Sequence, residues 1–68
     1  MKLKNRIKQR RAELGITQEE LAKQCGVGVA TIRRIESGWR NINVATLYKI
    51  EKGLKLPKGV LIMLIEED

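Results

Sequence analysis

Hydrophobic residues recur every three to four positions along most of the chain, and glycines interrupt the pattern. In the first such stretch, residues 3–14, the remaining positions are all polar or charged, mostly Lys and Arg. This narrow apolar stripe on a basic background predicts an amphipathic helix. Gly15 follows just beyond it, where a left-handed backbone costs glycine little. The stripe consists of Leu3, Ile7 and Leu14, with Ala12 nearby.

A second helix is predicted from a strong start signal. Thr17 can accept a hydrogen bond as the N-cap, and Glu20 three residues later completes a capping box. Ile16 precedes the cap and can pack against the first leucine of the helix. The helix is predicted to end at Cys25, because Gly26 follows. Its core positions are Leu21, Ala22 and Cys25, with the cysteine interpreted as a small core residue rather than a nucleophile.

A third helix is predicted between Gly28 and Ser37-Gly38, and its two faces differ in chemistry. Ile32 and Ile35 share one face and are predicted to be buried. The opposite face combines two apolar residues with two arginines, which is unusual on a surface without a function. The outward residues are Val29, Ala30, Arg33 and Arg34.

A fourth helix is predicted after a loop at residues 39–42, with Asn43 as its N-cap and Leu54 at its end. Gly53 is expected to weaken this helix slightly, because glycine is a poor helix former. The predicted core positions are Leu47, Ile50 and Leu54.

The C-terminal segment, residues 56–68, leaves two alternatives open. Pro57 suits the first position of a helix, and apolar residues follow it at helical spacing. The continuous apolar run from Val60 to Ile65 is also compatible with a strand, although a helix is the favoured interpretation. Surplus apolar surface at one end of a small domain usually indicates a partner. The helical stripe would contain Leu61, Leu64 and Ile65.

Length and composition limit the possible functions. A chain of 68 residues is expected to form one domain, residues 1–68, with a small core. It has no His and one Cys, which excludes an internal disulfide and a cysteine–histidine zinc site. The sequence contains no nucleophile–base pair and no glycine-rich phosphate loop, so we expect no enzyme, metal or cofactor.

Positive charge is concentrated in the first half of the chain. The net charge is +6, and residues 1–34 hold nine Lys or Arg and three Glu, whereas residues 35–68 hold five basic and five acidic residues. A one-sided basic field is typical of proteins that bind a polyanion, although a solvated surface is the alternative. A basic helix can also lie on a membrane, but residues 3–14 lack the wide apolar face and the aromatic residues that this requires.

Together these features resemble the Cro/phage-repressor family of helix-turn-helix domains, also called the XRE-type family. The resemblance extends from Ile7 to about Leu54, with the helix-turn-helix at residues 17–38. It implies an all-α fold: a compact, five-helix, lambda-repressor-like DNA-binding domain. The matching residues are Ile7 and Arg11, Gly15 to Ala22, Gly26 and Val27, Thr31 and Ile32, Ile35 to Gly38, and Leu47, Ile50 and Leu54.

The family commonly pairs an arginine of the first helix with an acid at the end of the third. Arg11 and Glu36 occupy these positions. The resemblance therefore implies a partly buried ion pair, and two unlinked surface charges are the alternative.

By the same resemblance, the third helix would lie in the major groove of DNA with its first residues toward the base edges. Arg33 or Arg34 is expected to read guanine through O6 and N7, and Val29 to lie near a thymine methyl group. Contact with phosphates alone is the alternative for both arginines. Gly28 stands where relatives often have Ser, Thr or Gln, which removes a cap and one polar contact. The base-contacting candidates are Val29, Ala30, Arg33 and Arg34.

The segments that flank the third helix are expected to hold DNA phosphates, which supply affinity without reading sequence. Amides at the start of the second helix predict an anion site there. Trp39 has two open interpretations: it lies against the sugar-phosphate backbone, or it covers the edge of the core. The phosphate-contacting candidates are Thr17, Gln18, Ser37, Arg40, Asn41 and Asn43.

The expected partners are double-stranded DNA and a second copy of the chain. Relatives usually bind palindromic sites as dimers. A dimer placed over a promoter would block polymerase, so transcriptional repression is the expected outcome, and activation by contact with polymerase is the alternative. The residues expected at the dimer interface are Leu56, Val60, Leu61 and Leu64.

The alternative function is an antitoxin or a bridging protein whose C-terminal segment binds another protein. No small-molecule ligand is expected. No signal peptide is recognised, and the longest apolar run is far shorter than the ~20 residues that cross a bilayer. The expected location is therefore the cytoplasm, on the nucleoid, for a bacterial or phage-encoded protein.

Overall fold

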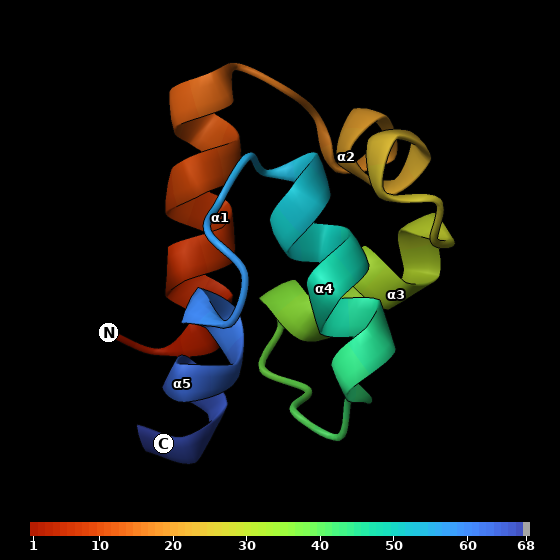
Figure 1. Cartoon of the computed structure of the whole chain (residues 1–68). Helices are drawn as coiled ribbons and strands as arrows, with labels where there is room; N and C mark the ends of the chain where they lie inside the picture. The colour runs from red at the N-terminus through yellow and green to blue at the C-terminus, as the bar shows by residue number, and fades with distance from the viewer. Residues whose placement is uncertain (68) are drawn as a thin grey trace.

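Residues 1–67, which the computed structural model describes, form five α-helices joined by short loops (Figure 1). The helices are α1 (Leu3–Leu14), α2 (Gln18–Cys25), α3 (Val29–Glu36), α4 (Val44–Gly53) and α5 (Val60–Glu67). The predicted all-α class is confirmed. The first four helices begin and end within one residue of the predicted positions.

Local chemistry sets the ends of these helices. Gly15 and Gly26 end α1 and α2 in the left-handed conformation, with φ of 68° and 72°. The Thr17 hydroxyl accepts from the amide of Glu20 at 3.0 Å, and the Thr17 amide donates to the Glu20 carboxylate at 2.9 Å. The predicted capping box is therefore present at α2. Asn43 caps α4 by accepting from the amide of Thr46 at 2.8 Å.

Helix α4 lies between α2 and α5, and α3 runs from α2 toward α1 (Figure 1). Helix α4 packs against α2 and α5, while α1 packs against α3 and α5. All five helices contribute to one hydrophobic core. The buried apolar residues are Leu3, Ile7, Leu21, Ala22, Cys25, Ile32, Ile35, Leu47, Ile50, Leu54 and Leu61. Ala12, predicted near the stripe of the first helix, is exposed.

The C-terminal segment is helical, so the strand alternative is wrong. Pro57 is not at the first position of this helix, which begins only at Val60. The chain must first turn back from α4, and it does so through two residues with positive φ, Lys55 at 58° and Gly59 at 95°. Proline preceding such a turn marks the link and not the helix start.

Glu51 is a buried carboxylate that the sequence pattern did not single out. Its side chain accepts from the amides of Gly59 at 2.9 Å and Leu61 at 2.8 Å, and the residue is 2% exposed. These bonds cap the start of α5, where the helix dipole also favours a negative charge. An acid on the stripe formed by Leu47, Ile50 and Leu54 was the available signal.

Gly53 has a packing role that the sequence did not reveal. A Cβ atom there would lie 2.3 Å from the Cys25 sulfur and 3.3 Å from the Cys25 backbone nitrogen. Glycine therefore permits the close approach of α4 to the end of α2, and its helix-weakening effect is secondary. Burial raises the pKa of the Cys25 thiol from 9.0 to about 11. Cys25 is thus a protonated core residue, as predicted.

Candidate nucleic-acid interface

The two faces of α3 differ as predicted. Ile32 and Ile35 are buried, whereas Ala30, Arg33 and Arg34 are exposed. Val29 was expected on the outward face, but it is half-buried and packs against the core. The fully outward surface of α3 is therefore smaller and more basic than the sequence predicted.

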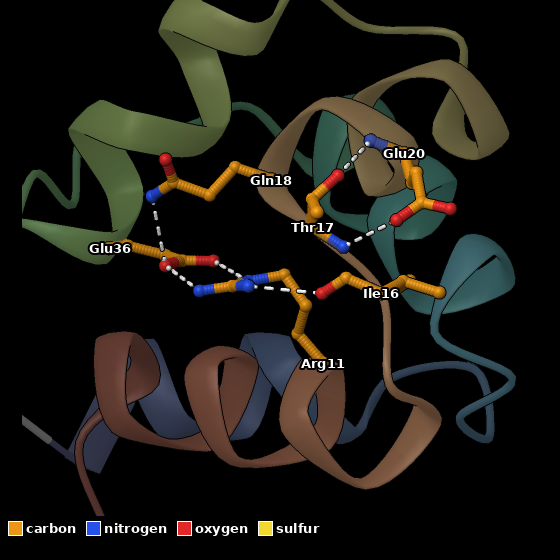
Figure 2. A network of polar contacts seen from close by, with 6 residues as sticks. All are labelled: Arg11, Ile16, Thr17, Gln18, Glu20 and Glu36. Atoms are coloured by element: carbon orange, nitrogen blue, oxygen red, sulfur yellow. Dashed lines mark hydrogen bonds and ion pairs between the residues drawn. The ribbon is translucent and has the colours of Figure 1, made fainter.

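A partly buried polar network fixes the orientation of α3 (Figure 2). The Arg11 guanidinium donates to both oxygens of Glu36, from Nε at 2.9 Å and from Nη2 at 3.0 Å. Its Nη1 also donates to the carbonyl oxygen of Ile16 at 3.0 Å. Hydrogen bonding to Glu36 raises the pKa of Arg11 above its usual value, so the guanidinium stays charged. Arg11 and Glu36 thus form the ion pair that the family resemblance implied.

Gln18 is the third member of this network. Its side-chain amide donates to Glu36 at 3.1 Å, and Figure 2 shows Arg11 and Gln18 reaching the same carboxylate from α1 and α2. Glu36 is only 3% exposed and receives three donors. This arrangement joins α1, α2 and α3, so the outward face of α3 has a set direction. Gln18 was expected to contact phosphate, yet here it supports α3.

The two arginines on the outward face have different partners. Arg33 donates to the Glu19 carboxylate of α2 at 3.0 Å, and both side chains are more than half exposed. The guanidinium carbon of Arg34 lies 5.9 Å from the centre of the Trp39 ring, a cation–π distance. Trp39 therefore contacts an α3 side chain. Neither contact was visible in the sequence, because each depends on how α3 meets a neighbouring element.

The other phosphate-contacting candidates surround α3, and several already make bonds within the chain. The Ser37 hydroxyl donates to the carbonyls of Arg33 and Arg34, and Arg40 donates to the carbonyl of Ile65. Thr17 and Asn43 are exposed N-caps, and Asn41 is exposed in the loop after α3. The capping box occupies the amides of Thr17 and Glu20, so the start of α2 offers fewer donors to an anion than predicted.

The predicted dimer residues are less accessible than expected. Leu61 is fully buried in the core of its own chain, so its assignment to an interface is wrong. Leu56, Val60 and Leu64 are half-buried and pack against the same core. Met63 is the large apolar side chain of α5 that is exposed, at 58%.

Among the described residues, no three or more His, Cys, Asp or Glu side chains form a group that could hold a metal ion. No helix within residues 1–67 is long and apolar enough to cross a membrane.

A family model described as "Helix-turn-helix" matches residues 7–61, from the middle of α1 to the first turn of α5. The chain belongs to the Cro/C1-type (XRE) helix-turn-helix family of DNA-binding transcriptional regulators. No solved structure matches it closely enough to count as a relative.

Among curated relatives of this helix-turn-helix chain, an HTH-type transcriptional regulator of Methanothermobacter thermautotrophicus is 36% identical over 62 residues, which cover 91% of this chain and 90% of the relative. A transcriptional regulator in the ATPase CF(0) region of Rhodospirillum rubrum is 40% identical over 52 residues, or 76% of this chain and 48% of that protein. The matched region thus spans about half the length of the Rhodospirillum protein. The antitoxin HipB of Escherichia coli K12 is 41% identical over 54 residues, covering 79% of this chain and 61% of HipB.

Proposed function

We propose that the chain is a sequence-specific regulator of transcription that places α3 in the major groove of DNA. The observation that carries this proposal is the exposed face of α3, with Ala30, Arg33 and Arg34 opposite the buried Ile32 and Ile35. Side chains held on a fixed helix can be presented to base edges in a constant register. The network around Glu36 supports that rigidity.

The exposed residues suit direct readout of bases. Arginine can donate to O6 and N7 of guanine together, and a methyl group such as that of Ala30 can contact the methyl of thymine. The half-buried Val29 has a smaller part in this contact than Ala30. Asn41 and the exposed caps Thr17 and Asn43 are proposed to lie along the phosphates.

We further propose that the protein acts as a homodimer on a palindromic operator. One domain of this size contacts few base pairs, and two copies would read half-sites ~34 Å apart, one helical turn of DNA. The exposed Met63 with the half-buried Leu64 places apolar surface on α5 for such a contact. A dimer bound over a promoter on the nucleoid would block polymerase, so repression is the proposed outcome.

An antitoxin is the second candidate, and the similarity to HipB favours it. An antitoxin of this kind would use one surface for its operator and another for a partner protein. A stoichiometric partner protein that purifies with the chain from its own cells supports this candidate. A homodimer that binds its operator without such a partner supports the first.

Selection of bound sequences from random DNA at a stated salt concentration tests the proposal. We expect a palindromic site for the native chain. Arg34→Ala should cost ~1–3 kcal/mol of binding free energy and relax preference at one base pair of each half-site. Lys52→Ala, which removes an exposed charge at the end of α4, is the control and should preserve the selected site.

Two outcomes would contradict the proposal. Equal weakening of Arg34→Ala on all sequences would show that this arginine contacts only phosphate. A selected site without two-fold symmetry would contradict the homodimer proposal. In that case Met63→Glu would leave the mass of the protein measured by sedimentation unchanged. Truncation after Lys58 is a poor substitute for this variant, because it also removes the core residue Leu61.

A further inference from the structure

A basic pocket lies outside the outward face of α3. It has a volume of about 150 Å³ and is bounded by the start of α1, the end of α3 and the loop that follows. In Figure 1, α3 runs from α2 toward the first turns of α1, which brings these three segments to one end of the fold. The lining residues are Lys2, Lys4, Ile35, Gly38 and Arg40.

The backbone leaves this pocket open. Ile35 is fully buried and supplies an apolar wall. Gly38 has φ of 114°, a region that favours glycine, and it places no side chain in the space. A Cβ atom at Gly38 would lie 3.9 Å from the Cδ atom of Lys4, so the stem of that lysine forms the facing wall.

The charge of the lining has one sign. Three of the five lining residues are cations and none is an acid. Glu36, at the end of α3, is already bonded to Arg11 and Gln18. Cationic groups around a concave, partly apolar surface focus the field and attract an anion.

The cationic groups also carry the donors that an anion binds. Lys2 precedes the first residue of α1, and its ammonium group, like that of Lys4, has three N–H donors. Arg40 donates to the carbonyl of Ile65, which holds its guanidinium at the pocket edge. A guanidinium carries five N–H donors in a fixed fork, so it can bind several acceptors at once.

We propose that this pocket binds a phosphate group through Lys2, Lys4 and Arg40. A phosphate offers several oxygens and up to two negative charges, which match three cationic donors arranged around a small space. The group can come from the backbone of bound DNA or from a free phosphorylated molecule. Only the DNA source rests on the proposed function.

The first part of the test uses inorganic phosphate and the full chain. Amide chemical shifts of Lys4, Gly38 and Arg40 are followed by NMR during titration with sodium phosphate, with sodium chloride of equal ionic strength as the reference. We expect saturable shifts with phosphate and none with chloride. Lys4→Gln should abolish the saturable shifts, whereas Lys52→Gln should retain them, and the melting temperatures of both variants report that they fold.

The second part of the test uses the selected DNA site. A lost phosphate contact lowers the slope of log K against log salt concentration by ~0.9. If DNA supplies the phosphate, Lys4→Gln should lower the slope by this amount and Lys52→Gln should not.

Saturable phosphate shifts with an unchanged salt slope support the pocket and assign it to a free phosphorylated molecule. A lowered slope supports the pocket and assigns it to DNA. Absence of both effects overturns the proposal. If the chain binds no DNA, the regulator proposal fails while the phosphate titration still decides the pocket.

Discussion

The fold contains two buried glutamates that are stabilised in different ways. Glu36, at the end of α3, is 3% exposed and accepts hydrogen bonds from the side chains of Arg11 and Gln18. Glu51, in α4, is 2% exposed and accepts from the backbone amides of Gly59 and Leu61. The Glu36 carboxylate is thus stabilised by a cation from another helix, whereas the Glu51 carboxylate is stabilised by backbone amides at the start of α5.

The difference separates two parts of the molecule. The Glu36 network joins α1, α2 and α3 through side chains, so it sets the direction of the outward face of α3 (Figure 2). The Glu51 bonds attach α5 to α4 through backbone groups that any sequence would provide. The direction of the outward face of α3 is therefore fixed by particular residues, whereas the attachment of α5 depends on one acid and the path of the chain.

Removal of the Glu36 carboxylate is expected to have the largest effect. Glu36→Ala leaves the Arg11 guanidinium, 23% exposed, without its carboxylate partner, and loss of one member of a buried pair costs ~3–5 kcal/mol of unfolding free energy. Denaturation by urea measures this loss.

The double variant Arg11→Met with Glu36→Leu is the control for this prediction. It removes both charges, so it should be clearly more stable than Glu36→Ala. A double variant that is less stable than Glu36→Ala would show that the ion pair is not the source of the effect.

Glu51→Ala is expected to have a smaller and more local effect. It leaves the amides of Gly59 and Leu61 without acceptors. If each unsatisfied amide lowers the unfolding free energy by ~1–2 kcal/mol, the total loss is ~2–4 kcal/mol. Hydrogen exchange should quicken most at the amides of α5, while those of α2 keep more of their protection. Uniform loss of protection in α2 and α5 would erase the distinction between the two glutamates.

Alkaline pH tests a third buried group, the Cys25 thiol, which has no charged partner. Below pH 9 the thiol is protonated in both the folded and the unfolded chain. Between pH 9 and about 11 only the unfolded chain ionises, because the folded pKa is about 11, so the unfolding free energy falls by ~1–3 kcal/mol. Under reducing conditions, the unfolding free energy of the native chain should therefore fall more steeply between pH 9 and about 11 than that of Cys25→Ala. Parallel pH curves for the two proteins would contradict the prediction.

Local features of the fold were predictable from the sequence. Helix caps act within one or two helical turns, so the residue types alone indicate them. Examples are the capping box at Thr17 and Glu20 and the glycines after α1 and α2. The Arg11–Glu36 pair joins residues 25 positions apart, and only the family resemblance indicated it.

The features that escaped prediction depend on how separate elements meet. Glu51 caps α5 only because the chain turns back through Lys55 and Gly59. Val29 and Leu61 are apolar residues whose exposure depends on the neighbouring helices, so a stripe alone could not assign them to a surface. The partners of the α3 arginines likewise depend on where α2 and the loop after α3 lie.

The contact between Arg33 and Glu19 makes any base contact by Arg33 an exchange reaction. The arginine already has a carboxylate acceptor at 3.0 Å, so an acceptor on DNA must replace it to be bound by the same nitrogen. An exposed pair of this kind is worth ~0–1 kcal/mol, less than the ~1–3 kcal/mol by which a bidentate arginine contact discriminates guanine from another base. A single phosphate oxygen accepts one hydrogen bond where guanine accepts two, and its negative charge is repelled by that of Glu19. Glu19 on α2 therefore disfavours a contact between Arg33 and a phosphate more than a contact between Arg33 and a guanine.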